Sequence, residues 1–145
     1  MSPRFFHAFA VVVFMGLLSC GSKSNSSQGV RESGDSLSVP DLEYIEDFFD
    51  FGTIYEGEIV SHTFMFKNAG NGILLIKDVI PSCGCTKSTV SRRLLKPGET
   101  GTVEVIFNST GWYGSQYKSV ALRTNSIINE KSVTIKANVV EGNGS

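Results

Sequence analysis

The sequence predicts an all-β fold, an antiparallel β-sandwich of about seven strands, over residues 43–141 of the 145-residue chain. From Tyr44 onward, apolar and polar residues alternate with a period of two, which indicates strands with one buried and one solvent-facing side. Short clusters of Gly, Pro, Asn and Ser separate these runs at intervals typical of a sandwich. No stretch of this region has a helical period, so we expect almost no helix.

Composition and charge fit one small globular domain. Hydrophobic residues make up 41% of the chain and charged residues 19%, as in ordinary globular proteins. The chain has 13 basic and 14 acidic residues, and without residues 1–19, which hold Arg4 and no acid, the net charge is about −2. This balance excludes the basic surface by which proteins attract nucleic acids. Roughly 100 residues remain for the core, enough for one domain.

The start of the chain predicts a signal peptide over residues 1–19. Arg4 precedes an apolar core from Ala8 to Leu18, and the small residue Ser19 follows it. This core is much shorter than the roughly 20 residues that a spanning helix needs. We therefore expect export rather than a membrane span.

The segment Leu17–Cys20 resembles a bacterial lipobox, in which the cysteine is acylated and becomes the first residue of the mature protein. By this resemblance Cys20 carries lipid. Acyl chains contribute about 0.8 kcal/mol per buried methylene, so several chains on one residue anchor a domain stably. The protein is then attached to a membrane by its N-terminal lipid without crossing it.

A flexible tether is predicted over residues 20–42, which are rich in Ser, Gly, Asn and Gln. Such a segment cannot bury enough apolar surface to offset its chain entropy. About 20 residues of this kind have a root-mean-square span of roughly 25 Å. Residues 142–145 are expected to form a disordered tail.

The strand pattern appears in five segments, in chain order residues 60–66, 73–80, 102–107, 119–123 and 133–139. In the first of them His62 shares a side with Phe64 and Phe66, so we expect an interior or interstrand histidine rather than a ligand. Residues 73–80 are apolar on both sides, which predicts a strand covered on both sides.

Turn sequences separate these strands. The segment Asn68–Gly72 supplies residues that tolerate positive φ, as a hairpin or corner needs. Lys96–Glu99 is a Pro-Gly turn, in which proline presets φ. Gly111–Gly114 and Thr124–Ser126 close two further intervals.

Five separated motifs appear in the same order as in a known family: Asp50–Ile54, Phe66–Gly70, Ser82–Thr86, Leu95–Glu99, and Val120–Asn125 with Val133–Val139. From Glu43 to Val140 the chain resembles the bacterial domain-of-unknown-function 1573 family. The resemblance implies an immunoglobulin-like sandwich related to hydin-type and major-sperm-protein-like domains, often in lipoproteins. It implies no activity, because the function of the family is not established.

Cys83 and Cys85 remain as free thiols once Cys20 is lipidated, and they form the centre of the candidate site. In an oxidising exported compartment, two thiols this close invite pairing. A disulfide prefers Cα atoms about 5.5 Å apart, so this spacing needs a tight bend, which Gly84 permits. The bridge would close almost no loop, would add little stability and would be easily reduced. Without chemistry, the pair would plug a strand end, with Gly84 forming a bulge.

Two chemical interpretations of this cysteine pair stay open. Lys87, Arg92 and Arg93 would lower the pKa of nearby thiols and favour a redox role, although the chain lacks the Cys-x-x-Cys helix start of redox enzymes. Two thiolates also suit Cu(I), with His62 or Met65 as further ligands. Intermolecular disulfides and a loop that docks a partner are the remaining alternatives.

Trp112 and Tyr113 lie between two glycines and have two interpretations. They form an exposed tip that contacts a partner, or they cap one end of the sandwich.

The sequence therefore favours a non-enzymatic binding or structural module, held at the bacterial cell envelope by lipid, that contacts a protein partner and needs no cofactor. The sandwich pattern, the anchor and the lack of a catalytic motif support this hypothesis. The alternative is a thiol-dependent redox or Cu(I)-handling protein that uses Cys83 and Cys85.

Overall fold

The computed structural model describes residues 38–142. The predicted signal peptide, Cys20 and most of the predicted tether lie outside these residues. Nine strands form the described part: β1 Leu42–Tyr44, β2 Phe48–Tyr55, β3 Ile59–Asn68, β4 Leu74–Pro81, β5 Thr86–Val90, β6 Leu94–Leu95, β7 Thr100–Asn108, β8 Gly114–Thr124 and β9 Glu130–Val140. Between residues 38 and 142 there is no helix with the length and hydropathy needed to span a membrane.

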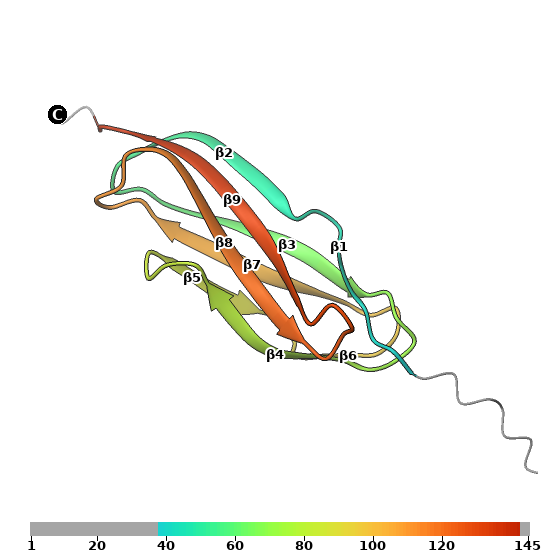
Figure 1. Cartoon of the computed structure of the whole chain (residues 1–145). Coiled ribbons are helices and arrows are strands. Elements are labelled where there is room, and N and C mark those ends of the chain that lie inside the picture. Colours follow the sequence, from blue (N-terminus) through green and yellow to red (C-terminus); the bar gives the residue numbers. More distant parts are fainter. Residues whose placement is uncertain (1–37, 143–145) are drawn as a thin grey trace, which may run out of the picture. The chain divides into compact units, whose positions relative to one another are not determined.

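The strands form two sheets that pack face to face (Figure 1). One sheet has the order β1-β3-β7-β5 and the other β2-β9-β8-β4-β6. This arrangement confirms the predicted all-β sandwich. Seven of the nine strands have five or more residues, while β1 has three and β6 has two. The expected strand number is therefore correct for the long strands.

Alternating side chains from the two sheets make the core. In β7 the odd-numbered residues from Gly101 to Phe107 are buried and the even-numbered residues between them are partly exposed. The largest buried side chains are Phe64, Phe66 and Phe107, all 0% exposed. Full burial of such a side chain contributes about 1.5–3 kcal/mol. The period of two in the sequence thus identified the side of each strand that faces the core.

The sandwich is not wholly antiparallel, because β2 pairs with β9 in parallel. The pairing shifts register after Asp50, whose carboxylate accepts hydrogen bonds from Lys136 Nζ and from the backbone N of Gly52, both at 2.8 Å. The bond from Lys136, then that from Gly52, lowers the pKa of Asp50. Between β1 and β2 the chain passes from one sheet to the other. Periodicity cannot reveal this crossing, because it reports burial and not partner direction.

The prediction that residues 73–80 are covered on both sides is wrong. In β4 Leu74 and Ile76 are buried, but Leu75 is 39% exposed and Ile80 is 36% exposed. The strand lies between β8 and the two-residue β6, and one of its faces is turned to solvent. An apolar run therefore marks here an exposed apolar surface rather than a doubly covered strand.

The chain enters the described part at a corner organised by Asn68. This fully buried amide donates to the carbonyls of Gly72 (2.7 Å) and Leu95 (3.1 Å). Its oxygen accepts from the backbone N of Asp41 (3.3 Å) and of Gly70 (3.1 Å). These contacts join the start of β1 to two turns, so the folded part begins before the expected domain start at residue 43.

Candidate functional site

Cys83 and Cys85 are joined by a disulfide in the turn between β4 and β5, with their Cα atoms 5.3 Å apart. The turn is closed by a hydrogen bond from Thr86 N to the carbonyl of Cys83 at 3.2 Å. Both cysteines are half-buried, and Cys85 packs against the edge of the core. The pair is therefore neither a fully buried plug nor an open dithiol.

Gly84 is an exposed turn residue and not a bulge within a strand. It is not among the glycines with positive φ, and a Cβ atom at this position would meet nothing within 4 Å. Gly84 therefore contributes to this bend neither a positive φ nor room for a close backbone approach. The tight spacing is accommodated by the turn itself.

Of the three basic residues expected near the thiols, only Lys87 lies at this site. Arg93 donates to the carbonyls of Ile76 and Lys77, at 3.3 and 2.9 Å. Arg92 lies 3.9 Å from Glu99, beyond the far end of β5. The basic cluster is thus separated from the disulfide by the length of the strand.

The predicted extra ligands for Cu(I) do not gather around the cysteines. The ring of His62 stacks on Phe49, with centroids 3.7 Å apart, and its Nε2 contacts Glu46. This position confirms the expected interstrand histidine. Met65 has the opposite parity in β3 and is 48% exposed. Residues 38–142 contain no group of three His, Cys, Asp or Glu side chains placed to hold a metal.

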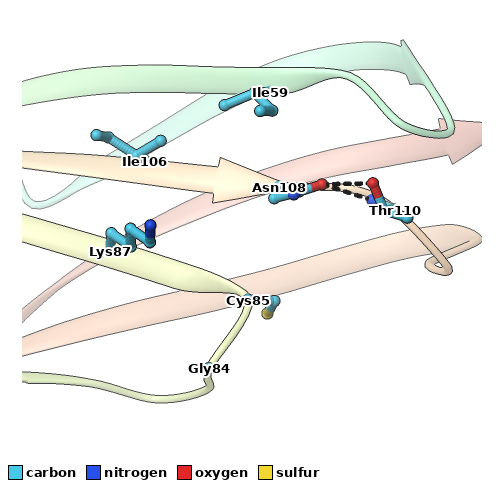
Figure 2. A pocket seen from close by; sticks show the side chains of 7 residues that line it. All are labelled: Ile59, Gly84, Cys85, Lys87, Ile106, Asn108 and Thr110. Carbon is cyan, nitrogen blue, oxygen red and sulfur yellow. Dashed lines mark hydrogen bonds between the residues drawn. The ribbon is translucent and has the colours of Figure 1, made fainter.

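A groove of about 250 Å³ opens beside the disulfide (Figure 2). It is lined by residues from β3, the β4–β5 turn, β5, β7 and the loop after β7, namely Ile59, Gly84, Cys85, Lys87, Ile106, Asn108 and Thr110. The carbonyl of Cys85 accepts a hydrogen bond from Asn108 N at 3.0 Å, which fixes the turn against β7. Asn108 Oδ1 in turn accepts from the backbone N and the hydroxyl of Thr110, at 2.9 and 2.7 Å.

The loop after β7 is held rigidly at this end of the sandwich. The hydroxyl of Ser109, which is 0% exposed, lies within hydrogen-bond distance of the carbonyls of Tyr55 (3.0 Å) and Glu58 (2.8 Å). A carboxylate oxygen of Glu56 accepts from Gly111 N at 2.7 Å. The loop is therefore tied to the β2–β3 turn, and the groove has a fixed wall.

Trp112 lies over the ammonium of Lys118, with Nζ 3.4 Å from the ring centroid. The same Nζ is 5.6 Å from the ring of Phe107. Lys118 is only 8% exposed, and burial lowers its pKa. Trp112 is 37% exposed and Tyr113 56% exposed. Trp112 therefore covers Lys118 at this end of the sandwich, and both aromatic side chains remain exposed, Tyr113 more than Trp112.

Replacing Trp112 with alanine is expected to lower the free energy of unfolding by about 2 kcal/mol, because it removes a cation–π contact and a large apolar cover. Tyr113→Ala serves as the control, and it should change stability by less than about 0.5 kcal/mol. Urea denaturation of both variants measures the difference. Equal losses would contradict the covering role of Trp112.

Most of the residues that line the groove were not predicted from the sequence. Ile106 shares its parity with Thr102 and Glu104, so it is an apolar residue on the solvent-facing side of a strand. Ile59, which is 65% exposed, directly follows Glu58. Exposed isoleucines at polar positions were the available signal. Their convergence with Cys85 depends on strand pairing, which the sequence does not display.

Several solved structures share the fold of this chain at low sequence identity. A protein of unknown function from Porphyromonas gingivalis W83 is 19% identical, with a TM-score of 0.61 over 70% of this chain and 47% of that one. The Vibrio cholerae VesB protease is 19% identical, with a TM-score of 0.54 over 68% and 31%. The ASH/PapD-like domain 7 of human CEP192 is 10% identical, with a TM-score of 0.53 over 97% and 99%.

These likenesses show the fold alone. The chain spans about half the length of the Porphyromonas protein and less than a third of the protease, so neither whole protein is a guide to activity. No curated protein matches the chain. The family model described as protein of unknown function (DUF1573) matches residues 42–139. The match covers most of the sequence, and the chain therefore belongs to the DUF1573 family.

Proposed function

We propose that this chain is a non-enzymatic, lipid-anchored module of the bacterial cell envelope that holds an extended segment of a partner protein in the groove beside Cys85. The observation that carries the proposal is the groove itself, in which Ile59, Ile106 and the disulfide form an apolar surface beside the edge strand β5. Because the groove is lined by β3, β7 and β5, an extended segment would lie across the outer face of this sheet, and the groove would accept one of its apolar side chains.

The size and lining of the groove favour a polypeptide segment over a small molecule. Its volume of about 250 Å³ is below the roughly 300–1,000 Å³ of typical small-molecule sites. Lys87 is the only ionisable residue among the seven that line it apart from the disulfide-bonded Cys85, so the groove contains no acid–base pair. An apolar side chain of the partner would fill the centre, and Lys87 and Asn108 would meet polar groups at the rim.

The position of the groove suits a tethered binding protein. Ile59 begins β3 and lines the groove, whereas Asn68 ends β3 and contacts the segment that begins at Ser38. Ten residues of strand separate these ends by roughly 30 Å. The tether adds a span of roughly 25 Å. Lipidation at Cys20 would thus leave the groove free of the membrane and able to reach a partner.

Photo-crosslinking in the native cells tests this proposal. A photoreactive amino acid at position 59 is expected to form an adduct with a discrete envelope protein. Ile45 is the matched control, because it is 60% exposed against 65% for Ile59 and lies beside Met65, farther along β3. Ile106→Glu should abolish the adduct, because a partner would then have to desolvate a charge in the groove. Equal adducts from positions 59 and 45 would overturn the proposal.

The disulfide supplies the second candidate, thiol–disulfide exchange with a partner, because Cys85 lines the same groove. The double substitution Cys83→Ser and Cys85→Ser separates the two functions. A binding module keeps its adduct from position 59 in this variant. If the double variant loses the adduct and the wild type forms a mixed disulfide on non-reducing gels, the function is thiol–disulfide exchange rather than binding.

A further inference from the structure

The end of the sandwich opposite the groove carries a second exposed apolar surface. It consists of five large side chains from β4 and the residue before it, from β6 and from the β8–β9 hairpin, here called the tether-end patch: Ile73, Leu75, Leu94, Ile127 and Ile128. We propose that this patch lies against the surface of the lipid bilayer that anchors Cys20. The inference rests on the proposed lipid anchor and adds an orientation of the domain on the membrane.

Three of these side chains form one continuous surface. Leu75 and Leu94 are opposite each other in the β4–β6 pair, and they are 39% and 59% exposed. Their neighbours Leu74 and Leu95, also paired, are fully buried. Ile73 is two residues before Leu75 and is 53% exposed. Since the side chains of a cross-strand pair share a face, Leu75 and Leu94 point to solvent on the same side, and the exposed Ile73 lies just before this strand.

The hairpin between β8 and β9 is fixed beside this surface by the side chain of Asn125. Its oxygen accepts from Leu75 N at 2.8 Å, and its amide donates to the carbonyl of Ile73 at 3.0 Å. The side chain thus pairs with the β4 backbone as a strand would. Thr124 closes the hairpin, because its backbone N donates to the carbonyl of Asn129 and its hydroxyl oxygen accepts from Ser126 N. The tip is therefore held in place rather than loosely attached.

Two isoleucines form this tip, and they are unusually exposed. Ile127 is 84% exposed and Ile128 59% exposed. A hairpin tip normally carries polar turn residues. Two adjacent isoleucines in a hydrogen-bonded tip, beside the exposed side chains of Ile73, Leu75 and Leu94, indicate a surface that is covered by something else.

The first described residues lie at the end of the sandwich where β6 is labelled (Figure 1). Ser38 Oγ donates to the carbonyl of Asn71 at 3.2 Å, and Val39 N donates to Asn71 Oδ1 at 2.7 Å. A Cβ atom on Gly72 would lie 2.6 Å from the carbonyl oxygen of Ser38. Gly72 immediately precedes Ile73, so the point of attachment and the patch are neighbours.

The charges around the patch do not oppose contact with a membrane. Arg123 lies 3.5 Å from Asp78 and 3.3 Å from Glu130, at the base of the hairpin. Lys131, the next residue, lies 3.2 Å from Asp41. Three acids thus share two cations, which leaves a net charge of about −1 among these residues, and this small charge does not prevent contact with a headgroup region.

Tethering makes a small patch sufficient. A flexible tether of about 20 residues would span roughly 25 Å, so lipidation at Cys20 would hold the patch near the bilayer at a high effective concentration. Burying such a side chain among acyl chains removes its apolar surface from water, which stabilises the contact. Partial burial of two or three is therefore enough to orient the domain, while the groove at the opposite end faces away from the membrane.

Tryptophan quenching in vesicles tests the orientation. The acylated full-length chain is reconstituted in vesicles of phosphatidylcholine and phosphatidylglycerol with brominated acyl chains. The wild type has a single tryptophan, Trp112, at the groove end, and it serves as the internal control. In the variant Ile127→Trp with Trp112→Phe, brominated lipid should quench emission at least threefold more than in the wild type.

The added substitution Ile128→Ser should reduce this quenching, because it removes apolar surface from the tip. If Trp112→Phe prevents folding, the variant Ile127→Trp is used alone. The difference between its quenching and that of the wild type then reports on position 127. Equal quenching at both positions in vesicle-bound protein would overturn the orientation and leave the anchor intact. Failure of the full-length chain to remain on vesicles would overturn the lipid anchor and the orientation together. If a second copy of the chain or a bound partner abolishes the quenching, the patch is a protein contact and the proposed orientation is wrong.

Discussion

Replacing Asn68 with alanine is expected to lower the free energy of unfolding by roughly 3–5 kcal/mol, since each buried polar group left without a partner costs about 1–3 kcal/mol. The amide is 0% exposed and makes four hydrogen bonds. Two of its partners, the carbonyls of Gly72 and Leu95, would lose a donor inside the protein. The start of β1 and two turns would separate, because this one side chain joins them.

Urea denaturation followed by circular dichroism measures this loss. Asn138→Ala is the matched control, because Asn138 is a partly exposed asparagine within β9. Its replacement should change the free energy of unfolding by less than about 1 kcal/mol. If both variants unfold at the same urea concentration, Asn68 does not organise the corner.

The same corner shows how far the sequence supports a physical argument. The segment Asn68–Gly72 was expected to be a turn, and it is one, but its two glycines do not supply a positive φ. Gly70 and Gly72 are not among the glycines with positive φ. A Cβ atom on Gly70 would lie 2.2 Å from the carbonyl oxygen of Val39. Glycine is needed here for the close approach of a distant segment, which local sequence cannot reveal.

The strands illustrate a similar division. Alternation placed Phe64, Phe66 and Phe107 in the core, because a period of two reports burial directly. It could not report that β2 pairs in parallel with β9. Nor could alternation distinguish a doubly covered strand from one with an exposed apolar face. An apolar run such as residues 73–80 is compatible with both arrangements. Partner identity and coverage are properties of the whole fold.

The candidate site was predictable only at its covalent centre. The spacing of Cys83 and Cys85 suggested pairing, and the structure contains that disulfide. The side chains expected near the cysteines do not lie there. The positions of Arg92, Arg93 and His62 depend on strand length and on parity within the strand. Ile59 and Ile106 lie far apart in sequence and line one groove only because β3 pairs with β7.

Two neighbouring substitutions in β7 are expected to affect different properties. Phe107→Ala should lower stability, and Ile106→Ala should lower binding. Phe107 is 0% exposed and faces the core, so its truncation should cost about 3–5 kcal/mol, from lost transfer energy and the cavity left behind. Ile106 faces the groove, and its truncation should cost less than about 1 kcal/mol.

Crosslinking from position 59 should follow the reverse order, provided that it is measured where both variants are folded. Ile106→Ala removes part of the groove wall and should lower the adduct yield severalfold, because the partner loses its apolar contact. Phe107→Ala leaves the groove-facing side chains in place, so its folded fraction should crosslink as the wild type does. Urea denaturation gives the stability of each variant, and adduct yield per folded molecule gives its binding. If binding falls in proportion to stability in both variants, the groove acts only as part of the fold, and the partner must dock elsewhere.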